Sequence, residues 1–282
     1  MPAEDLHATL AAAQVIAREA GAILLDHRGR VGIEYKGEAD LVTAADRASE
    51  RHITARLRAA FPQHAMVAEE GTRTEGAGLC WYVDPLDGTT NFAHGLPFFA
   101  VSMGLADADT TVAGLVYNPV LDEMFTALRG AGAWLNGQPI RVSSQDQIAA
   151  SLLATGFPSR KRHENPNIHF YQYFSLNSHG MRRLGSAALD LCYTACGRFE
   201  GFWEFNLQPW DVAAGRLIVT EAGGRVSDML GQAHHLYSPE ILASNGRLHP
   251  TLLAAFVALF DQPGQEVAPL PPPAAYLQGR RS

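Results

Sequence analysis

The sequence of 282 residues predicts a layered fold of the α/β or α+β class. Helical and extended patterns alternate in blocks along the chain, a β-meander of short strands lies in its middle, and no internal repeat is present. An apolar content of 47% with 18% charged residues is that of an ordinary globular protein. This length can form one large domain or two tightly joined halves.

Helices are predicted where apolar residues recur at intervals of three and four. The predicted helices cover residues 6–25, 43–60, 167–176, 186–196, 210–223 and 248–260. Gly29 is well placed to stop the chain after the first helix, and Pro62 follows the second. The second helix begins with Thr43 and Asp46 spaced as in a capping box, with Asp in the position of Glu.

Strands are predicted at short apolar runs that are broken by Asp, Asn, Pro or Gly. The predicted strands cover residues 65–68, 81–83, 100–105, 112–117, 123–128, 132–135, 152–155, 225–227 and 241–243. Asn136-Gly137 is a strong hairpin signal. Two of the strands end in carboxylates, Glu69-Glu70 and Asp84, and open sheets tend to bind ligands at the carboxyl ends of their strands.

The most informative segment places Asp84 and Asp87 three residues apart in a turn stiffened by Pro85. Carboxylates held that close repel one another unless a cation lies between them, which indicates bound Mg²⁺. Gly88 and Thr89 follow, and their free backbone N–H groups would suit a phosphate. The same string is also typical of an ordinary turn, so the metal interpretation depends on acids elsewhere in the chain.

Two further acidic elements complete the predicted site. Glu69 and Glu70 follow a strand and point in opposite directions, so at most one joins the other acids, and a solvated loop is the alternative. Asp211 follows Trp210 at a helix start, where a capping role is the default and one carboxylate oxygen stays free for a metal. Such acids could hold two or three Mg²⁺ ions, and two ions roughly 4 Å apart could clamp an in-line displacement at phosphorus.

Composition restricts the partners and the compartment. The formal net charge is −7 and no long Lys/Arg run is present, which argues against nucleic acid as the main ligand. Cys192 and Cys196 are four residues apart and could touch, but buried free thiols are the commoner explanation.

The N-terminus lacks the pattern of a signal peptide and no uninterrupted apolar stretch of about 18 residues exists, so a cytoplasmic location is expected. Residues 263–282 are Pro-rich and are expected to form a flexible tail; a partner-docking segment is disfavoured because no PxxP unit repeats.

These motifs resemble those of the inositol monophosphatase family of Mg²⁺-dependent, lithium-sensitive phosphatases. The matching segments are WYVDPLDGTTNF at 81–92, WDVAAG at 210–215, TEAGG at 220–224, AEEG at 68–71, and Lys36 followed by DLVT at 40–43 and Asp46. Ala68 replaces the usual Gly of the acidic motif. The similarity covers about residues 6–260 and implies the α-β-α-β-α sandwich of the inositol monophosphatase and fructose-1,6-bisphosphatase type. It implies one catalytic unit at 1–262, with an α+β half at about 1–145 and an α/β half at about 146–262.

The resemblance also implies roles for individual residues. The first metal would be held by Glu69, Asp84 and the carbonyl of Leu86, the second by Asp84, Asp87 and Asp211, and a third by Glu69 through water. Glu69 and Thr89 would orient a metal-activated water, and Asp46 would support the Thr89 hydroxyl. Substrate would contact Leu86, Asp87, Gly88, Thr89, Arg182, Gly185, Ser186, Ala187, Glu204 and Asp211. A role for Lys36 is also implied, with a plain surface lysine as the alternative.

The segments RRLGSAALD at 182–190 and GFWE at 201–204 resemble the inositol-type pattern of the bacterial branch. Glu204 lies seven residues before Asp211, where the family places the carboxylate that receives ring hydroxyls; the alternative is an exposed Glu after an aromatic strand. Arg182 would reach substrate or a dimer interface, whereas Arg183 would face solvent. The implied activity is hydrolysis of myo-inositol 1-phosphate by direct attack of water.

Three alternatives stay open: the same chemistry on fructose 1,6-bisphosphate or histidinol phosphate, the same chemistry on 3′-phosphoadenosine nucleotides, and a regulatory role with the transcription and RNA-processing machinery. Homodimers are common in the family and are expected on that ground alone.

Overall fold

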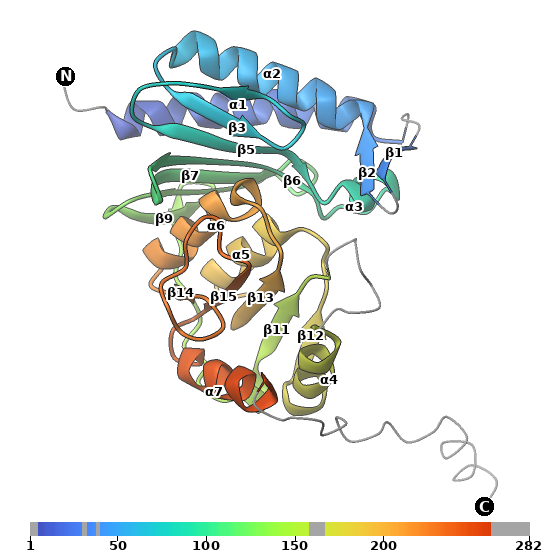
Figure 1. Ribbon diagram of the computed structural model, residues 1–282, viewed down its shortest axis with the longest axis vertical. Helices are drawn as coiled ribbons and strands as arrows, with labels where there is room; N and C mark the ends of the chain where they lie inside the picture. The colour runs from blue at the N-terminus through green and yellow to red at the C-terminus, as the bar shows by residue number, and fades with distance from the viewer. Residues whose placement is uncertain (1–4, 30–32, 38–39, 158–166, 261–282) are drawn as a thin grey trace, which may run out of the picture.

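The computed structural model describes residues 5–29, 33–37, 40–157 and 167–260, with the backbone alone at 33–37 and 40–43. Figure 1 shows five layers, in which helices cover the outer face of one sheet, further helices lie between that sheet and a second one, and others cover the far side of the second sheet. The α-β-α-β-α sandwich is therefore confirmed. The helices are α1 (Leu6–His27), α2 (Ala44–Ala60), α3 (Thr89–Ala93), α4 (Asn167–Asn177), α5 (Ala187–Ala195), α6 (Pro209–Glu221) and α7 (His249–Phe260), with a 3-10 turn at Ile148–Ala150.

The first sheet has eight strands in the order β10-β9-β8-β7-β6-β5-β3-β4. They are β3 (Ala65–Ala68), β4 (Arg73–Thr74), β5 (Cys80–Asp87), β6 (Ala100–Asp107), β7 (Thr110–Asn118), β8 (Glu123–Leu128), β9 (Gly132–Leu135) and β10 (Gln138–Pro139). All neighbours pair antiparallel except β3 and β5, which run parallel. The parallel pair brings Glu69 and Asp84 side by side, because Glu69 follows Ala68 at the end of β3 and Asp84 follows Val83, the residue of β5 that pairs with Ala68.

The second sheet has five strands in the order β12-β11-β13-β15-β14. They are β11 (Leu152–Thr155), β12 (Gly180–Arg182), β13 (Gly201–Phe205), β14 (Arg225–Ser227) and β15 (Glu240–Ser244). β11 pairs parallel with both of its neighbours, and the other pairs are antiparallel. A separate hairpin is formed by β1 (Ile33–Gly37) and β2 (Asp40–Thr43).

The alternation of side chains along each strand divides the interior into three cores. In β13, Phe202 packs among α5 and α6, whereas its neighbour Trp203 packs on the far side among α4 and α7. Trp81 and Val83 of β5 likewise face the layer of α1 and α2, whereas Tyr82 faces α6. Each sheet is thus covered on both faces, which is why its strands carry nearly continuous apolar runs.

Helix α6 lies unusually close to the first sheet because glycines face it. A Cβ atom at Gly104 of β6 would lie 2.6 Å from Cβ of Ala213, and one at Gly114 of β7 would lie 2.9 Å from Cα of Ala214. Cβ atoms do not approach so closely, so these two positions require glycine for α6 to sit where it does. This packing holds the first turn of α6, with Asp211, at the carboxyl end of β5.

Most predicted elements are confirmed, and the differences have local causes. The predicted turn at Pro85 is wrong: β5 continues to Asp87, pairing Asp84 with Ser102 and Asp87 with Ala100. Two residues on β5 therefore lie where β6 has one, so a bulge replaces the turn. The strands β1, β2, β4, β10 and β12 and the helix α3 were not predicted, because they are too short to show a period, and β13 was expected only as an aromatic strand before Glu204.

Helix α1 is long and apolar enough to cross a membrane by length and composition alone. Its apolar stripe, which includes Leu10, Ile16 and Leu24, is buried in the core shared with α2 and the first sheet. Such a helix is an ordinary core element of a layered protein. The three cysteines are free, as predicted. The predicted tail at 263–282 lies outside the described residues.

Candidate active site

The bulge of β5 positions the first two acids. Asp84 is buried, and its Oδ1 accepts a hydrogen bond of 2.9 Å from the backbone N–H of Leu86. The bulge is held from outside by Ser49, whose hydroxyl donates to the carbonyl oxygen of Pro85 at 2.9 Å. The second oxygen of Asp84 is left for another ligand.

Asp87 ties this bulge to the second half of the chain. Its Oδ2 accepts hydrogen bonds from the hydroxyl of Ser186 at 2.6 Å and from the backbone N–H of Ala188 at 2.7 Å. Ser186 is also the N-cap of α5, because its side chain accepts from the N–H of Leu189. Burial raises the pKa of Asp87 to about 6, although these hydrogen bonds oppose the shift.

Asp211 stands in the first turn of α6, but it is not the N-cap. Gln208 is the cap, Pro209 follows it, and Asp211 takes the third helical position in a reciprocal capping box. Its Oδ2 accepts from the backbone N–H of Gln208 at 2.7 Å. Asp211 therefore takes part in capping α6, as expected, but from the third helical position and not from the N-cap. Its Oδ2 makes the capping hydrogen bond.

Glu69 is held in place by an acid that the sequence analysis missed. The buried carboxylate of Glu50, on α2, accepts from the backbone N–H of Glu70 at 2.6 Å. It also accepts from the N–H and the hydroxyl of Thr72, at 3.1 and 2.7 Å. These bonds fix the loop that carries Glu69. The available signal was the spacing of Asp46 and Glu50, which puts two acids on one face of a helix.

The four predicted acids lie within electrostatic reach of one another. Burial raises the pKa of Asp84 well above its usual range, and neighbouring charges raise it further; they are those of Glu69, Asp87 and Asp211. Burial likewise raises the pKa of Asp211, with Asp87, Glu69 and Glu204 adding to the effect. Acids that destabilise each other's ionised form in this way need a counter-charge to be ionised together.

This donor set fits Mg²⁺, which prefers oxygen ligands and uses few carboxylates for each ion. Asp84, Asp87 and Asp211 each use a carboxylate oxygen to accept from backbone N–H groups, which fixes the orientation of the three side chains. Within residues 5–29, 33–37, 40–157 and 167–260, however, no three Asp, Glu, His or Cys side chains are already disposed to hold one ion. The acids are close enough to raise one another's pKa.

Thr89 and Asp46 form the predicted pair. The Thr89 hydroxyl lies 3.1 Å from Oδ1 of Asp46 and 3.1 Å from the carbonyl oxygen of Leu86. A hydroxyl has one proton, so it donates to only one of the two at a time. When it donates to Asp46, the Leu86 carbonyl becomes available to another partner.

The predicted substrate contacts from both halves of the chain meet beside this pair. Gly88 has a φ of 91° and begins α3; a Cβ there would lie 3.2 Å from the carbonyl oxygen of Gly185. Asn91 joins the segments, because its side-chain amide donates to the carbonyl oxygens of Phe98 and Leu184, both at 2.6 Å. Ser186 and Ala187 follow at the start of α5.

Glu204 is buried in β13 and is not the exposed residue of the alternative interpretation. Its carboxylate lies against Gly156, where no side chain would fit. Burial raises its pKa to about 8, with the charge of Asp87 as a further cause and Arg183 opposing it. Glu204 therefore lies within reach of the acid cluster, as its predicted role requires.

A second missed residue is Asp190, in α5. Its side chain is 1% exposed, and neither carboxylate oxygen has a hydrogen-bond partner. Burial raises its pKa well above the usual range, and the charges of Glu204 and Asp87 add to the shift. An acid inside an otherwise apolar helix was the available signal.

The two arginines before α5 are both exposed. Arg182 is exposed, and its guanidinium donates to the carbonyl oxygen of Met181. Arg183 is exposed as predicted, but its guanidinium lies over the ring of Phe157 and its charge lowers the pKa of Glu204. Of the two arginines, Arg183 is therefore the one whose charge acts on Glu204. Lys36 lies in β1, and its side chain is outside the described part of the structure.

Comparison with known proteins identifies the family of this chain. The model of the inositol monophosphatase family matches residues 5–260. The chain belongs to the inositol monophosphatase family. A relative named Nus factor SuhB, from Pseudomonas aeruginosa, is 44% identical over 247 residues, which cover 84% of this chain and 91% of that protein. An inositol-1-monophosphatase from Synechocystis is 43% identical over 259 residues, or 90% of each chain.

The solved structure of inositol monophosphatase from Anabaena (Nostoc) superposes with a TM-score of 0.82 at 37% identity. It covers 96% of this chain and all of that one. Family membership therefore extends over the whole described molecule, including both halves that contribute acids to the site.

Proposed function

We propose that this family member is a Mg²⁺-dependent phosphatase that hydrolyses myo-inositol 1-phosphate and related small phosphate monoesters to the alcohol and phosphate. The observation that carries the proposal is the meeting of Glu69, Asp84, Asp87 and Asp211, each near enough to raise the pKa of another. Glu69, Asp84 and Asp87 come from the first half of the chain and Asp211 from the second. The two halves therefore act as one catalytic unit.

The metal ligands are assigned from the donor set. Glu69, Asp84 and the Leu86 carbonyl would hold one ion, and Asp84, Asp87 and Asp211 a second, with Glu69 reaching a third through water. When bound, Mg²⁺ would neutralise the clustered acids and the phosphate and lower the pKa of water.

The protein's own groups handle the water and its proton. The Thr89 hydroxyl donates a hydrogen bond to Asp46, so its oxygen lone pairs would be free to accept from and orient the attacking water. Glu69 accepts the proton that this water loses as its oxygen attacks phosphorus, the ester P–O bond breaks on the opposite side, and the departing oxygen takes a proton from solvent water to give the alcohol. No covalent intermediate with the enzyme forms. The backbone N–H groups of Gly88 and Thr89 would hold the phosphate oxygens.

The polyol part of the substrate would lie toward Glu204. A carboxylate accepts hydrogen bonds from two adjacent hydroxyls, and Glu204 is held rigidly in β13 against Gly156. Gly185, Ser186 and Ala187 would line the same side, with Arg182 and Arg183 at its rim. Preference for inositol over other alcohols would depend on this side of the pocket and not on the acid cluster.

Phosphate release from a panel of esters tests the proposal. The esters are myo-inositol 1-phosphate, fructose 1,6-bisphosphate, histidinol phosphate and a 3′-phosphoadenosine nucleotide, each with and without Mg²⁺ and Li⁺. We expect Mg²⁺-dependent, Li⁺-inhibited turnover that is highest on inositol 1-phosphate, and Glu204→Gln to raise KM for that ester. Faster hydrolysis of another ester, with inositol 1-phosphate turnover unchanged in Glu204→Gln, would reject the inositol assignment but keep the phosphatase.

A second candidate role follows from the relatives that carry the name Nus factor SuhB. A role with the transcription machinery could coexist with catalysis, because the acids of the site are all retained. Affinity capture with wild-type protein and with Asp84→Asn separates the two roles. Equal capture of transcription components by both proteins supports a scaffold role, and capture by neither rejects it.

A further inference from the structure

A pocket separate from the acid cluster lies at the opposite end of α6 from Asp211. It has a volume of about 470 Å³ and is lined by the segment from Arg141 to Ser144, the end of α6 and the turn before α7. Eleven residues separate Asp211 from Ala222, which corresponds to about 16 Å of helix. No acid of the active site lines this pocket.

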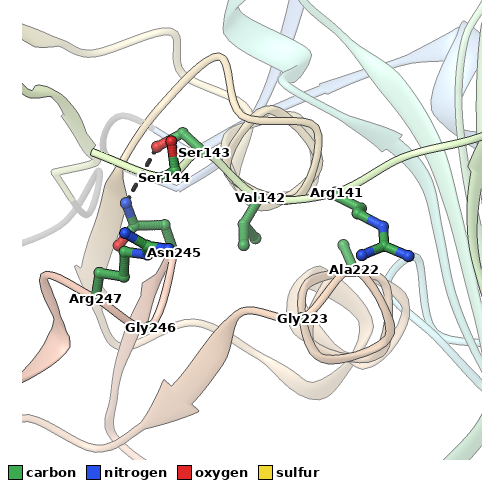
Figure 2. A pocket seen from close by; sticks show the side chains of 9 residues that line it. All are labelled: Arg141, Val142, Ser143, Ser144, Ala222, Gly223, Asn245, Gly246 and Arg247. Atoms are coloured by element: carbon green, nitrogen blue, oxygen red, sulfur yellow. Dashed lines mark hydrogen bonds between the residues drawn. The ribbon is translucent and has the colours of Figure 1, made fainter. Parts of the chain in front are cut away.

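The pocket carries two arginines that are free to bind a ligand. Arg141 and Arg247 are both exposed, and neither forms an ion pair or a side-chain hydrogen bond with any described residue. Figure 2 shows them on opposite walls, with Arg141 beside the end of α6 and Arg247 beside Asn245. The formal net charge of the chain is −7, so an unpaired pair of guanidinium groups in one concavity stands out against an acidic background.

No described carboxylate lines the pocket to neutralise them. The acids nearest in sequence to the lining residues are used elsewhere: Glu221 accepts from the backbone N–H groups of Gly130 and Gly132, and Asp146 accepts from the side chain of Gln147. The carbonyl oxygen of Ala222, at the negative end of α6, accepts from the N–H of Val142. The local charge is therefore positive.

The wall beside Arg247 is rigid and polar. The side-chain amide of Asn245 donates to the hydroxyl of Ser143 at 3.1 Å and to the carbonyl oxygen of Gln145 at 2.7 Å, and its oxygen accepts from the N–H of Leu248. No described residue accepts the proton of the Ser143 hydroxyl, and Ser144 is exposed next to it (Figure 2). The same turn leads directly into α7 (His249–Phe260), so Asn245 is also tied to the start of that helix.

We propose that this pocket binds a small phosphate-bearing molecule, with Arg141 and Arg247 holding its anionic oxygens from the two walls. Each guanidinium presents a planar fork of donors that matches phosphate oxygens, and Ser143 and Ser144 supply hydroxyls for the polar remainder. No aromatic side chain lines the pocket, so it offers no surface on which a base could stack. This favours a small phosphorylated polar molecule over a nucleic acid. The site is independent of the proposed catalytic function.

Titration of the metal-free protein with inorganic phosphate, followed by ³¹P NMR in EDTA at low salt, tests the proposal. Without divalent ions the acid cluster repels phosphate, so binding reports on the arginine pocket. We expect saturable binding that is weakened at least tenfold in the double variant Arg141→Gln/Arg247→Gln and unchanged in Arg58→Gln, which removes an exposed arginine of α2. All three arginines are exposed, so the variants should fold.

Two results would overturn the proposal. One is the absence of saturable phosphate binding, or equal binding by the double variant and the wild type. The other is displacement of phosphate from the wild-type pocket by a single-stranded RNA oligonucleotide at lower concentration than by glycerol phosphate, which would assign the arginines to a nucleic-acid backbone.

Discussion

The hydroxyl of Ser186 donates a hydrogen bond of 2.6 Å to Oδ2 of Asp87, although the two residues are 99 positions apart in the chain. Ser186 begins α5 in the second half, and Asp87 ends β5 in the first. The same serine therefore caps a helix and orients an acid of the candidate metal site. Folding of α5 and formation of the site are linked through this contact.

Ser186→Ala should lower both stability and affinity for Mg²⁺. Loss of an N-cap costs about 1 kcal/mol, and loss of the bond to Asp87 removes an interaction that keeps the pKa of that acid from rising further. We expect a lower unfolding midpoint in urea and a higher Mg²⁺ concentration for half-maximal activity, most clearly below pH 7. Ser175→Ala, which removes a hydroxyl from the exposed surface of α4, serves as the control. A loss of stability with unchanged Mg²⁺ dependence would restrict Ser186 to capping.

Glu50→Gln should impair catalysis indirectly, because Glu50 holds the loop that carries Glu69 and does not itself contact the substrate. The Gln side chain keeps one acceptor oxygen and turns an N–H₂ group toward donors, so part of the set from Glu70 and Thr72 is lost. An unsatisfied buried group costs about 1–3 kcal/mol. We expect kcat to fall at least tenfold with a smaller change in KM. Glu75→Gln, at an exposed position in the following loop, should behave like the wild type; equal kinetics for Glu50→Gln would separate that loop from catalysis.

The layered fold could be predicted from the sequence because its long elements carry strong periods. Helix α1 repeats apolar residues at helical spacing, and the strands that are covered on both faces read as apolar runs. The bulge from Asp84 to Asp87 could not be predicted from the sequence, because the Asp-Pro-x-Asp-Gly string is also favourable for a turn. The pairing of Asp84 with Ser102 and of Asp87 with Ala100 shows that the segment is a bulge in a strand and not a turn.

The predicted acids of the site come together, but their supports were invisible in the sequence. Glu50 holds Glu69 through backbone groups of a loop, and Ser186 holds Asp87 across the two halves. Such contacts depend on how layers pack and leave no local pattern. Family motifs can point to the acids, whereas the partners of those acids require coordinates.

Asp190→Asn should stabilise the protein at high pH. Both oxygens of Asp190 are buried without a partner, and its pKa lies well above the usual range mainly because of burial. The folded state thus favours the protonated acid. As pH rises above the pKa of Asp190 in the unfolded state, the unfolded state ionises more readily than the folded state, and the free energy of unfolding falls. A neutral amide avoids that cost, so we expect a gain of about 1 kcal/mol at pH 8 that shrinks toward pH 5. Destabilisation at every pH would show that the carboxylate has a favourable partner, such as a buried water.

The metal-free protein should lose stability between about pH 4.5 and 8, in part through Glu204. Its pKa rises from 4.5 to about 8 on folding, chiefly through burial. Folding therefore favours the neutral form of Glu204. The stabilisation that results is complete below the pKa of the unfolded state, 4.5, and is lost as pH rises through the pKa of the folded state, about 8. Urea unfolding in EDTA across this range should show a negative slope with pH that is reduced in Glu204→Gln. The same slope in both proteins would mean that other acids account for it.

Gly104→Ala should displace α6 and with it Asp211. The added Cβ would lie 2.6 Å from Cβ of Ala213, so the helix must move away from β6. Such overpacking costs about 1–3 kcal/mol. Because Asp211 is in the first turn of the same helix, we expect the Mg²⁺ requirement to rise together with the loss of stability. Gly180→Ala is a matched control, since a Cβ there would have ordinary contacts at 3.5 Å. Urea unfolding and Mg²⁺ titration of phosphatase activity measure both effects, and a destabilised variant with normal Mg²⁺ dependence would show that Asp211 keeps its place when the helix shifts.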